Sequence, residues 1–228
     1  ARLIDLSANR DGFIADLSPA GRPGAMLVGS SPEVLVKRQG STVSAFPLAG
    51  SSPRRASAAE DHLAGQDLLH SSKDLHEHAF VVDHLRRALT PLCERLDIPD
   101  VPQLISTNEM WHLGTPISGT LKDKDLTALE LALAVHPTPA ICGTPAEAAQ
   151  ALIETAETDR GFYAGAVGWC DSSGDGEYMV AIRCAEVAGD GLSARAWAGG
   201  GIVGDSDAQA ELEETTAKLR TILKALSL

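Results

Sequence analysis

Two segments of the sequence carry carboxylates at helical spacing. Asp74 and Glu77 lie three residues apart in a stretch that is predicted to be helical. Glu211 and Glu214 repeat that spacing near the C-terminus, and Lys218 follows one turn later. Side chains three, four or seven residues apart share one face of a helix, and each pair alone is typical of a solvated face. Together the two pairs could hold a hard divalent cation such as Mg²⁺, which prefers oxygen ligands.

Three further features could act on an anionic ligand. Glu33 follows a Ser-Pro pair at the start of a predicted strand, where partial burial would raise its pKa and suit it to general acid catalysis. Arg183 lies within a predicted strand, and an inward Arg183 would clamp a carboxylate. Gly199, Gly200 and Gly201 would let backbone N–H groups approach an anion closely. The alternatives are an edge-strand charge for Glu33 and a solvent-facing Arg183.

A proline-punctuated run, His136-Pro-Thr-Pro-Ala, is followed by Gly143-Thr-Pro. Proline fixes φ, donates no N–H and pushes the preceding residue into an extended conformation. The run is therefore predicted to be a rigid loop that carries an imidazole and two hydroxyls.

The composition excludes several classes of partner. The 228 residues are 44% apolar and 22% charged, with a formal net charge of −12. This charge argues against nucleic-acid and anionic-membrane partners, and an anionic ligand would need a cation or local Arg and Lys. The four cysteines are widely spaced, which predicts free thiols in a reducing compartment. No apolar run approaches the ~18 residues of a membrane span, and no signal peptide is recognisable. We therefore expect a cytoplasmic protein.

The elements that would position these residues come in groups. Helices are predicted over 58–69, 72–96, 126–134, 146–157 and 208–226, and strands over 25–29, 33–37, 42–46, 104–107, 111–113, 163–170, 178–186 and 193–198. The long helix would bury a stripe made of Leu75, Ala79, Val82, Leu85, Leu89 and Leu92. Ser206 is the predicted N-cap of the last helix, with Gln209 completing a capping box. Adjacent strands with helices grouped between them favour an α+β fold with antiparallel sheets.

Nine short motifs occur in a characteristic order. They are Ser-Pro-Glu, Pro-Leu-Ala-Gly-Ser, Ser-Lys-Asp-x-His-Glu-His, Trp-His-Leu, His-Pro-Thr-Pro-Ala, Gly-Trp-Cys-Asp, Ile-Arg-Cys-Ala, Ala-Gly-Gly-Gly-Ile-Val and Glu-Glu-Thr-x-x-Lys. From about residue 26 onward this set resembles the chorismate-utilising enzymes, and within them the isochorismate synthases. The His-Pro-Thr-Pro run separates that subgroup from anthranilate, aminodeoxychorismate and salicylate synthases. The resemblance implies one chorismate-binding catalytic domain over residues 1–228, a monomer in which antiparallel sheets pack as a sandwich with flanking helices.

The resemblance also implies a role for each matching residue. Glu77 and Glu214 would hold Mg²⁺, with Asp74 and Glu211 at the outer positions. Glu33 would be the general acid that protonates the departing C4 hydroxyl, and His136 would lie near the ring. The pocket and the substrate's carboxylate would be served by Ala49, Gly50, Ser51, Tyr163, Arg183, Gly199, Gly200, Gly201 and Lys218.

The implied reaction is the Mg²⁺-dependent conversion of chorismate to isochorismate. Water adds at C2 while the C4 hydroxyl leaves, so one face of the ring needs a base and the other an acid. In the family the base is a lysine in a Lys-Val-Val-Leu-(Ala/Ser)-Arg strand. Residues 1–5 resemble the end of that strand, which places the lysine about four positions before Ala1. Residues 9–12 stand where about a dozen more are expected, so N-terminal and internal segments are expected to be missing from the sequence.

Two alternatives stay open. A salicylate-forming relative would also eliminate pyruvate. Tyr163 favours it and the run at His136 argues against it. A catalytically inert paralogue would bind chorismate through Glu77, Glu214 and Arg183 without a base. The pathway that would use isochorismate, for a siderophore, menaquinone or salicylate, is also left open.

Overall fold

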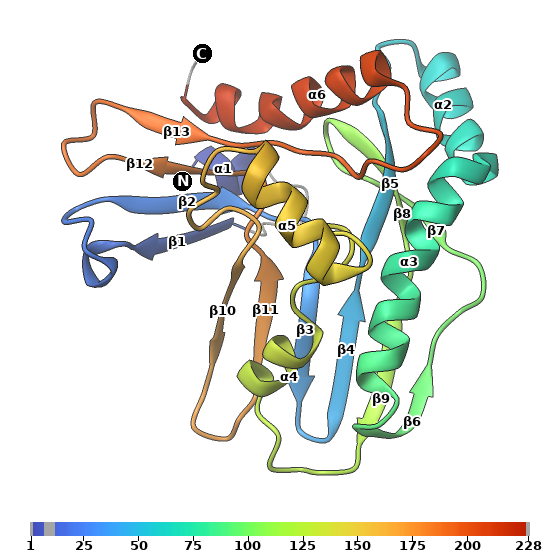
Figure 1. Cartoon of the computed structure of the whole chain (residues 1–228), viewed down its shortest axis with the longest axis vertical. Coiled ribbons are helices and arrows are strands. Elements are labelled where there is room, and N and C mark those ends of the chain that lie inside the picture. The colour runs from blue at the N-terminus through green and yellow to red at the C-terminus, as the bar shows by residue number, and fades with distance from the viewer. Residues whose placement is uncertain (1, 7–11, 227–228) are drawn as a thin grey trace.

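The computed structural model describes residues 2–6 and 12–226, and its strands form three antiparallel sheets (Figure 1). The strands are β1 (Gly12–Asp16), β2 (Met26–Ser30), β3 (Val34–Gln39), β4 (Thr42–Phe46), β5 (Leu48–Pro53), β6 (Cys93–Asp97), β7 (Gln103–Ser106), β8 (Met110–Gly114), β9 (Ile117–Leu121), β10 (Ala166–Cys170), β11 (Gly176–Val180), β12 (Cys184–Val187) and β13 (Ala194–Ala196). The helices are α1 (Arg2–Leu6), α2 (Ala58–His70), α3 (Ser72–Leu89), α4 (Ala128–Val135), α5 (Ala146–Ala156) and α6 (Ala208–Leu226), with a 3₁₀ turn at Ser18–Ala20. The sheets have the orders β1-β2-β12-β13, β10-β11-β3-β4-β9-β6 and β5-β8-β7. The predicted α+β fold with antiparallel sheets is confirmed.

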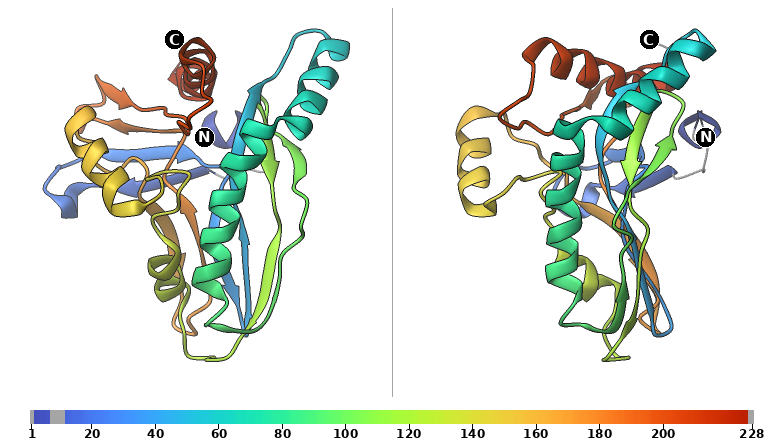
Figure 2. Two further views of the ribbon diagram at one scale, coloured as in Figure 1. Left: turned by 45° about the vertical axis from the view of Figure 1, so that its right-hand side comes forward. Right: turned by 90° about the vertical axis from the view of Figure 1, so that its right-hand side faces the viewer.

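The main core lies between the six-stranded sheet and two helices. α3 and α4 cover one face of this sheet, whereas α5 stands away from the sheets between two loops (Figures 1 and 2). Leu85 and Leu89 of α3 and Leu131 of α4 pack against Val36 and Val43 of the sheet, each at most 2% exposed. Burying such side chains stabilises the fold by roughly 1.5–3 kcal/mol each. The core therefore anchors the helix that carries Asp74 and Glu77.

The long helix is shorter than predicted. α3 ends at Leu89, and residues 93–97 form the edge strand β6 in place of a further helical turn. Pro91 explains the difference, because proline has no N–H to donate to the next helical hydrogen bond. The predicted apolar stripe of this helix was also wrong in one residue. Ala79 is exposed, and Val81 is buried together with Val82. Strand β9 was missed altogether.

The strand predicted over residues 178–186 is in fact two strands in different sheets. β11 ends in the six-stranded sheet, the chain crosses over residues 181–183, and β12 begins in the four-stranded sheet. Arg183 therefore does not lie mid-strand. Its φ of 50° is in the left-handed region, which is uncommon for a residue with a side chain and often marks a functional site.

Two expectations about the first and last elements of the chain were also wrong. Residues 2–6 form helix α1, where the end of a strand was expected. The side chain of Asp207 accepts a hydrogen bond from the N–H of Ala210 and so caps α6, whereas the Ser206 hydroxyl accepts one from Val203 outside the helix. Of the segment 9–12, which was expected to be shortened, residues 9–11 lie outside the described residues.

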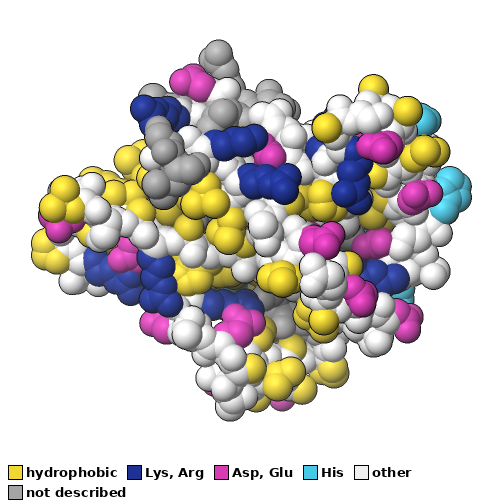
Figure 3. Space-filling model, turned by 90° about the horizontal axis from the view of Figure 1, so that it is seen from above, with side chains coloured by type: hydrophobic (Ala, Val, Ile, Leu, Met, Phe, Trp, Pro, Cys, Tyr) yellow, Lys and Arg dark blue, Asp and Glu magenta, His cyan; other side chains and the backbone are white. Residues whose placement is uncertain are grey.

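The remaining expectations concern the cysteines, membrane-spanning helices and the charge of the surface. All four cysteines are free, as predicted. Within the described ranges, no helix has the length and apolar character that crossing a membrane requires. The face around α6 carries Lys and Arg side chains together with Asp and Glu (Figure 3). That mixture differs from the uniformly basic surface typical of nucleic-acid binding.

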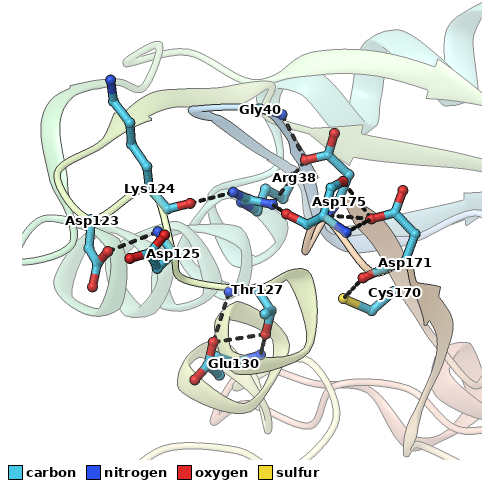
Figure 4. Close-up of polar contacts among 11 residues, drawn as sticks. Arg38, Gly40, Asp123, Lys124, Asp125, Thr127, Glu130, Cys170, Asp171 and Asp175 are labelled. Carbon is cyan, nitrogen blue, oxygen red and sulfur yellow. Dashed lines mark hydrogen bonds and ion pairs between the residues drawn. The ribbon is translucent and has the colours of Figure 1, made fainter.

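A buried arginine connects three segments of the chain through hydrogen bonds (Figure 4). Arg38 of β3 is 5% exposed and donates to the carbonyls of Ser173 and Lys124 at 2.8 and 2.6 Å. It also pairs with Asp175, whose carboxylate accepts a hydrogen bond from the N–H of Gly40. The β10–β11 turn and the segment before α4 are thereby fixed to the six-stranded sheet.

Replacing Arg38 with methionine is expected to destabilise the protein strongly. The change Arg38→Met leaves two carbonyls and a carboxylate without their donor, which lowers the free energy of unfolding by about 3 kcal/mol. Urea denaturation measures this loss. Lys37→Met is the matched control, because Lys37 is on the same strand with its side chain 48% exposed. A loss below about 1 kcal/mol for Arg38→Met would show that the cluster is not needed for stability.

Candidate functional site

A pocket opens where the three sheets meet α3, α6 and the segment before α6. Its volume is about 100 Å³. The predicted site residues that line it are Glu33, Ala49, Gly50, Ser51, Glu77, Tyr163, Arg183, Gly199, Gly200, Gly201, Glu214 and Lys218. Asp74 and Glu211 are not part of the lining but lie next to two of its glycines. Asp74 is beside Gly50, and Glu211 is beside Gly200. The fold therefore gathers most of the predicted residues from seven separate parts of the sequence.

Glu33 is buried in the pocket wall. It is 4% exposed, which excludes the alternative of an edge-strand charge. Burial raises the pKa of Glu33 to about 7, while a backbone hydrogen bond from Leu48 and the charges of Lys218 and Arg183 oppose that rise. The side chain can therefore hold a proton near neutral pH and give it to a bound ligand.

The raised pKa makes stability depend on pH. The pKa of Glu33 is about 7 in the folded protein and 4.5 as the ordinary value, so the stability that the protonated group confers is complete below pH 4.5 and is lost as the pH rises through 7. Glu33→Gln keeps the neutral form at every pH. At pH 8.5 it is expected to raise the free energy of unfolding by about 3 kcal/mol, with little difference at pH 4. Urea denaturation at both pH values tests this, and an effect that is the same at both would contradict it.

Arg183 faces a buried histidine that the sequence analysis did not assign to the site. His112 is 5% exposed, and its Nε2 lies 3.5 Å from Nη2 of Arg183. Burial, with the charges of Arg183 and Lys218, holds the pKa of His112 well below its usual value, so the ring is neutral and can accept from the guanidinium. The signal that could have found it is strand register, because His112 pairs with Ser51 across β5 and β8.

His136, which the resemblance places near the ring, is not among the residues that line the pocket. His136 ends α4, and its Nε2 lies 3.0 Å from the carbonyl oxygen of Ala164. The pocket lining contains that alanine but not His136. His136 thus contacts the lining from behind, and His112 is the histidine that the structure brings into the pocket.

Two aromatic side chains form one wall of the pocket. The rings of Tyr163 and Trp197 stack with centroids 6.2 Å apart and planes at 10°. Arg160 also lines the pocket, donates to the carbonyl of Ile141 at 2.7 Å and pairs with Glu157. Trp197 and Arg160 were not predicted. No sequence signal distinguishes them from ordinary strand and turn residues.

The glycine-rich segment passes directly against the carboxylates. A Cβ on Gly201 would lie 2.3 Å from Oε1 of Glu77, and one on Gly200 would lie 3.0 Å from Oε2 of Glu211. Any side chain at Gly201 would therefore displace Glu77. Lys218 connects α6 to this segment. Its ammonium donates to the carbonyl of Gly199 at 3.0 Å and pairs with Glu214.

Four carboxylates gather beside this segment, two from α3 and two from α6. We call Asp74, Glu77, Glu211 and Glu214 the carboxylate cluster. Their side chains are 10–15% exposed, so neither helix face is the solvated surface that each pair alone suggests. Burial raises the pKa of Glu77 to about 7; Lys73 opposes this rise, and Glu214 adds to it.

The donor set of the cluster suits a hard divalent cation. Carboxylate oxygens are the ligands that Mg²⁺ prefers, and they are poor partners for the softer metals that need His or Cys. Oε2 of Glu211 is buried and has no hydrogen-bond partner, so it remains available as a ligand. Across residues 2–6 and 12–226, no three such side chains already converge on one point. Instead, the ammonium of Lys73 lies between three of them.

The sequence of the chain matches a known family. A family model described as chorismate binding enzyme matches residues 17–227. The chain belongs to this family. The predicted resemblance to chorismate-utilising enzymes is confirmed.

Individual members of the family are similar over nearly the whole chain. The chain is 53% identical over 227 residues to MenF of Mycobacterium tuberculosis, covering 99% of this chain and 61% of that protein. It is 50% identical over 217 residues to the isochorismate synthase DhbC of Bacillus subtilis, covering 94% of this chain and 54% of that protein. The crystal structure of DhbC from Bacillus anthracis has a TM-score of 0.87 and 49% identity, over 90% of this chain and 54% of the other. The chain thus spans about half to three fifths of the length of these relatives.

Proposed function

We propose that this chorismate binding enzyme is an isochorismate synthase, that is, an isomerase that converts chorismate to isochorismate. The buried Glu33 at the wall of the pocket carries the proposal, since a carboxylic acid with a pKa of about 7 can protonate a leaving hydroxyl at neutral pH. The identity of about half of all residues with the isochorismate synthase DhbC supports the same reaction.

The charges of the pocket suit a dianionic substrate. Arg183 is 7% exposed and lines the pocket, so its guanidinium can bind one carboxylate of chorismate with two parallel hydrogen bonds. His112 accepts from Arg183 and fixes its orientation. Lys218 and the backbone N–H groups of residues 199–201 supply further donors on the same side. In a chain with a net charge of −12, these local cations are what would make the pocket attractive to an anion.

The carboxylate cluster is proposed to hold Mg²⁺. Glu77 and Glu214 line the pocket and would bind the ion beside it, with Asp74 and Glu211 behind them. When bound, Mg²⁺ supplies positive charge to the carboxylate on the ring of chorismate. The chain's own residues then orient the ring between the Tyr163–Trp197 wall and the segment before β3 that carries Glu33.

In the proposed reaction the C4–O bond breaks as the proton of Glu33 passes to the departing hydroxyl. Water adds at C2 from the other face and gives up a proton, so the overall change is an isomerisation. We assign no base to the described residues, because Lys218, the ammonium that lines the pocket, is held by Glu214 and Gly199. A monomer in the cytoplasm is the setting that we propose.

Product analysis tests the proposal. The intact gene product, with the upstream segment that is expected to carry the base lysine, is incubated with chorismate and Mg²⁺, and the products are separated by chromatography with fluorescence detection. Isochorismate without salicylate or pyruvate is expected. Salicylate with pyruvate would favour the lyase alternative, which Tyr163 in the pocket wall favours. Chorismate that binds but does not react would instead indicate an inert binding protein.

A further inference from the structure

Lys73 occupies the centre of the carboxylate cluster. Its Nζ lies 3.0 Å from Oε1 of Glu211, 3.5 Å from Oδ1 of Asp74 and 3.8 Å from Oε2 of Glu77. The lysine is in the first turn of α3 while Glu211 is on α6, so the ammonium joins the two helices that form the cluster. A surface lysine would not make three such contacts, and this one is 23% exposed.

The formal charges of the cluster point to one divalent cation. Its four carboxylates are partly offset by the ammonium groups of Lys73 and Lys218, which leaves two negative charges uncompensated. Buried charges that lack a partner are strongly unfavourable, so such a site gains most from a ligand of charge +2. The buried and unpartnered Oε2 of Glu211 independently indicates that a cation is still to be accommodated.

We infer that Lys73 is a built-in counter-ion that holds the carboxylate cluster together before Mg²⁺ arrives and competes with Mg²⁺ for Glu211. This inference rests on the proposed function, in which the cluster binds Mg²⁺. Both cations draw on the negative charge of the same carboxylates and repel each other, so each weakens the binding of the other. Lys73 would thereby set the Mg²⁺ concentration at which the enzyme becomes active.

The structure provides a place for the displaced ammonium. Lys73 lines a cavity of about 760 Å³ that lies beside the pocket, with Glu77, Gly200 and Gly201 shared between the two. On its far side this cavity is bounded by Phe80 of α3 and by the apolar face of α5. Its opening gives the lysine access to water when the ion takes its place at Glu211.

Calorimetric titration of Mg²⁺ tests the competition. Wild type, Lys73→Met and the control Lys37→Met are titrated at pH 8, and binding is measured without any activity assay. The Kd of Lys73→Met for Mg²⁺ is expected to be about tenfold lower than that of wild type, because one positive charge is removed next to the divalent cation. Lys37, which pairs with Glu177 at the surface, is expected to have no effect. An unchanged or higher Kd in Lys73→Met overturns the role of Lys73. A wild type that binds no Mg²⁺ overturns the metal site itself, and this inference with it.

A second measurement uses wild type alone, in case the methionine variant does not fold. Lysines are labelled with acetic anhydride with and without Mg²⁺, and each site is quantified by mass spectrometry. Labelling of Lys73 is expected to rise severalfold with Mg²⁺, while Lys37 and the exposed Lys224 stay constant. Labelling of Lys73 that is unchanged or lower with bound Mg²⁺ would show that the ion does not displace it.

Discussion

Glu33→Gln is expected to abolish the formation of isochorismate while leaving chorismate binding nearly intact. The amide has the size of the protonated acid, but it cannot give a proton to the leaving hydroxyl. General acid catalysis contributes up to about 10⁴-fold, so kcat is expected to fall by roughly 10³-fold. Turnover and, separately, the Kd of chorismate by calorimetry measure the two effects.

A loss of turnover in Glu33→Gln is not expected to result from misfolding. Because Gln resembles the neutral form of Glu33, the variant is expected to fold at least as well as wild type at the pH of the assay. Turnover that persists within tenfold of wild type would remove Glu33 from the role of acid. A large loss of binding would instead make it a substrate ligand. In wild type, kcat/KM is expected to decline as the pH rises through about 7, since the acid loses its proton there.

Glu214→Ala is expected to raise the Mg²⁺ requirement steeply. The variant removes a carboxylate that lines the pocket and also frees the ammonium of Lys218 within it. Loss of a ligand-supporting partner typically weakens metal sites by 10–100-fold, and loss of a direct ligand is expected to reach about 100-fold or more. The Mg²⁺ concentration for half-maximal activity measures the effect.

The matched control is the neighbouring glutamate on the same helix. Glu213 is exposed and bonds to Gln209 one turn earlier, away from the carboxylate cluster. Glu213→Ala is therefore expected to leave the Mg²⁺ titration unchanged. Equal titrations for Glu214→Ala and wild type would mean that the face of α6 holds no metal.

The sequence was most informative where chemistry depends on short motifs. The carboxylate pairs at Glu77 and Glu214, the acid at Glu33 and the glycine-rich segment could all be named in advance, because local spacing and motif order suffice to find them. The structure shows that they meet in one pocket. Their individual roles stay predictions until the variants are measured.

What the sequence could not provide depends on contacts between distant segments. Arg183 appeared to be a strand residue, because nothing local shows that the chain changes sheets there. His112 became a pocket residue only through its pairing with Ser51, and His136 attracted attention through its prolines although its ring points to Ala164. Lys73 was likewise not assigned to the site, because its contact with Glu211 depends on the placement of α6 beside α3.

The most direct test of the proposed reaction is turnover in ¹⁸O-labelled water. The intact wild-type gene product, with the segment expected before Ala1, is incubated with chorismate and Mg²⁺ in H₂¹⁸O, and the product is identified by chromatography and mass spectrometry. The account predicts isochorismate with one ¹⁸O in the hydroxyl at C2, because water adds there while the original C4 hydroxyl leaves. Unlabelled isochorismate, or salicylate and pyruvate in its place, would contradict it.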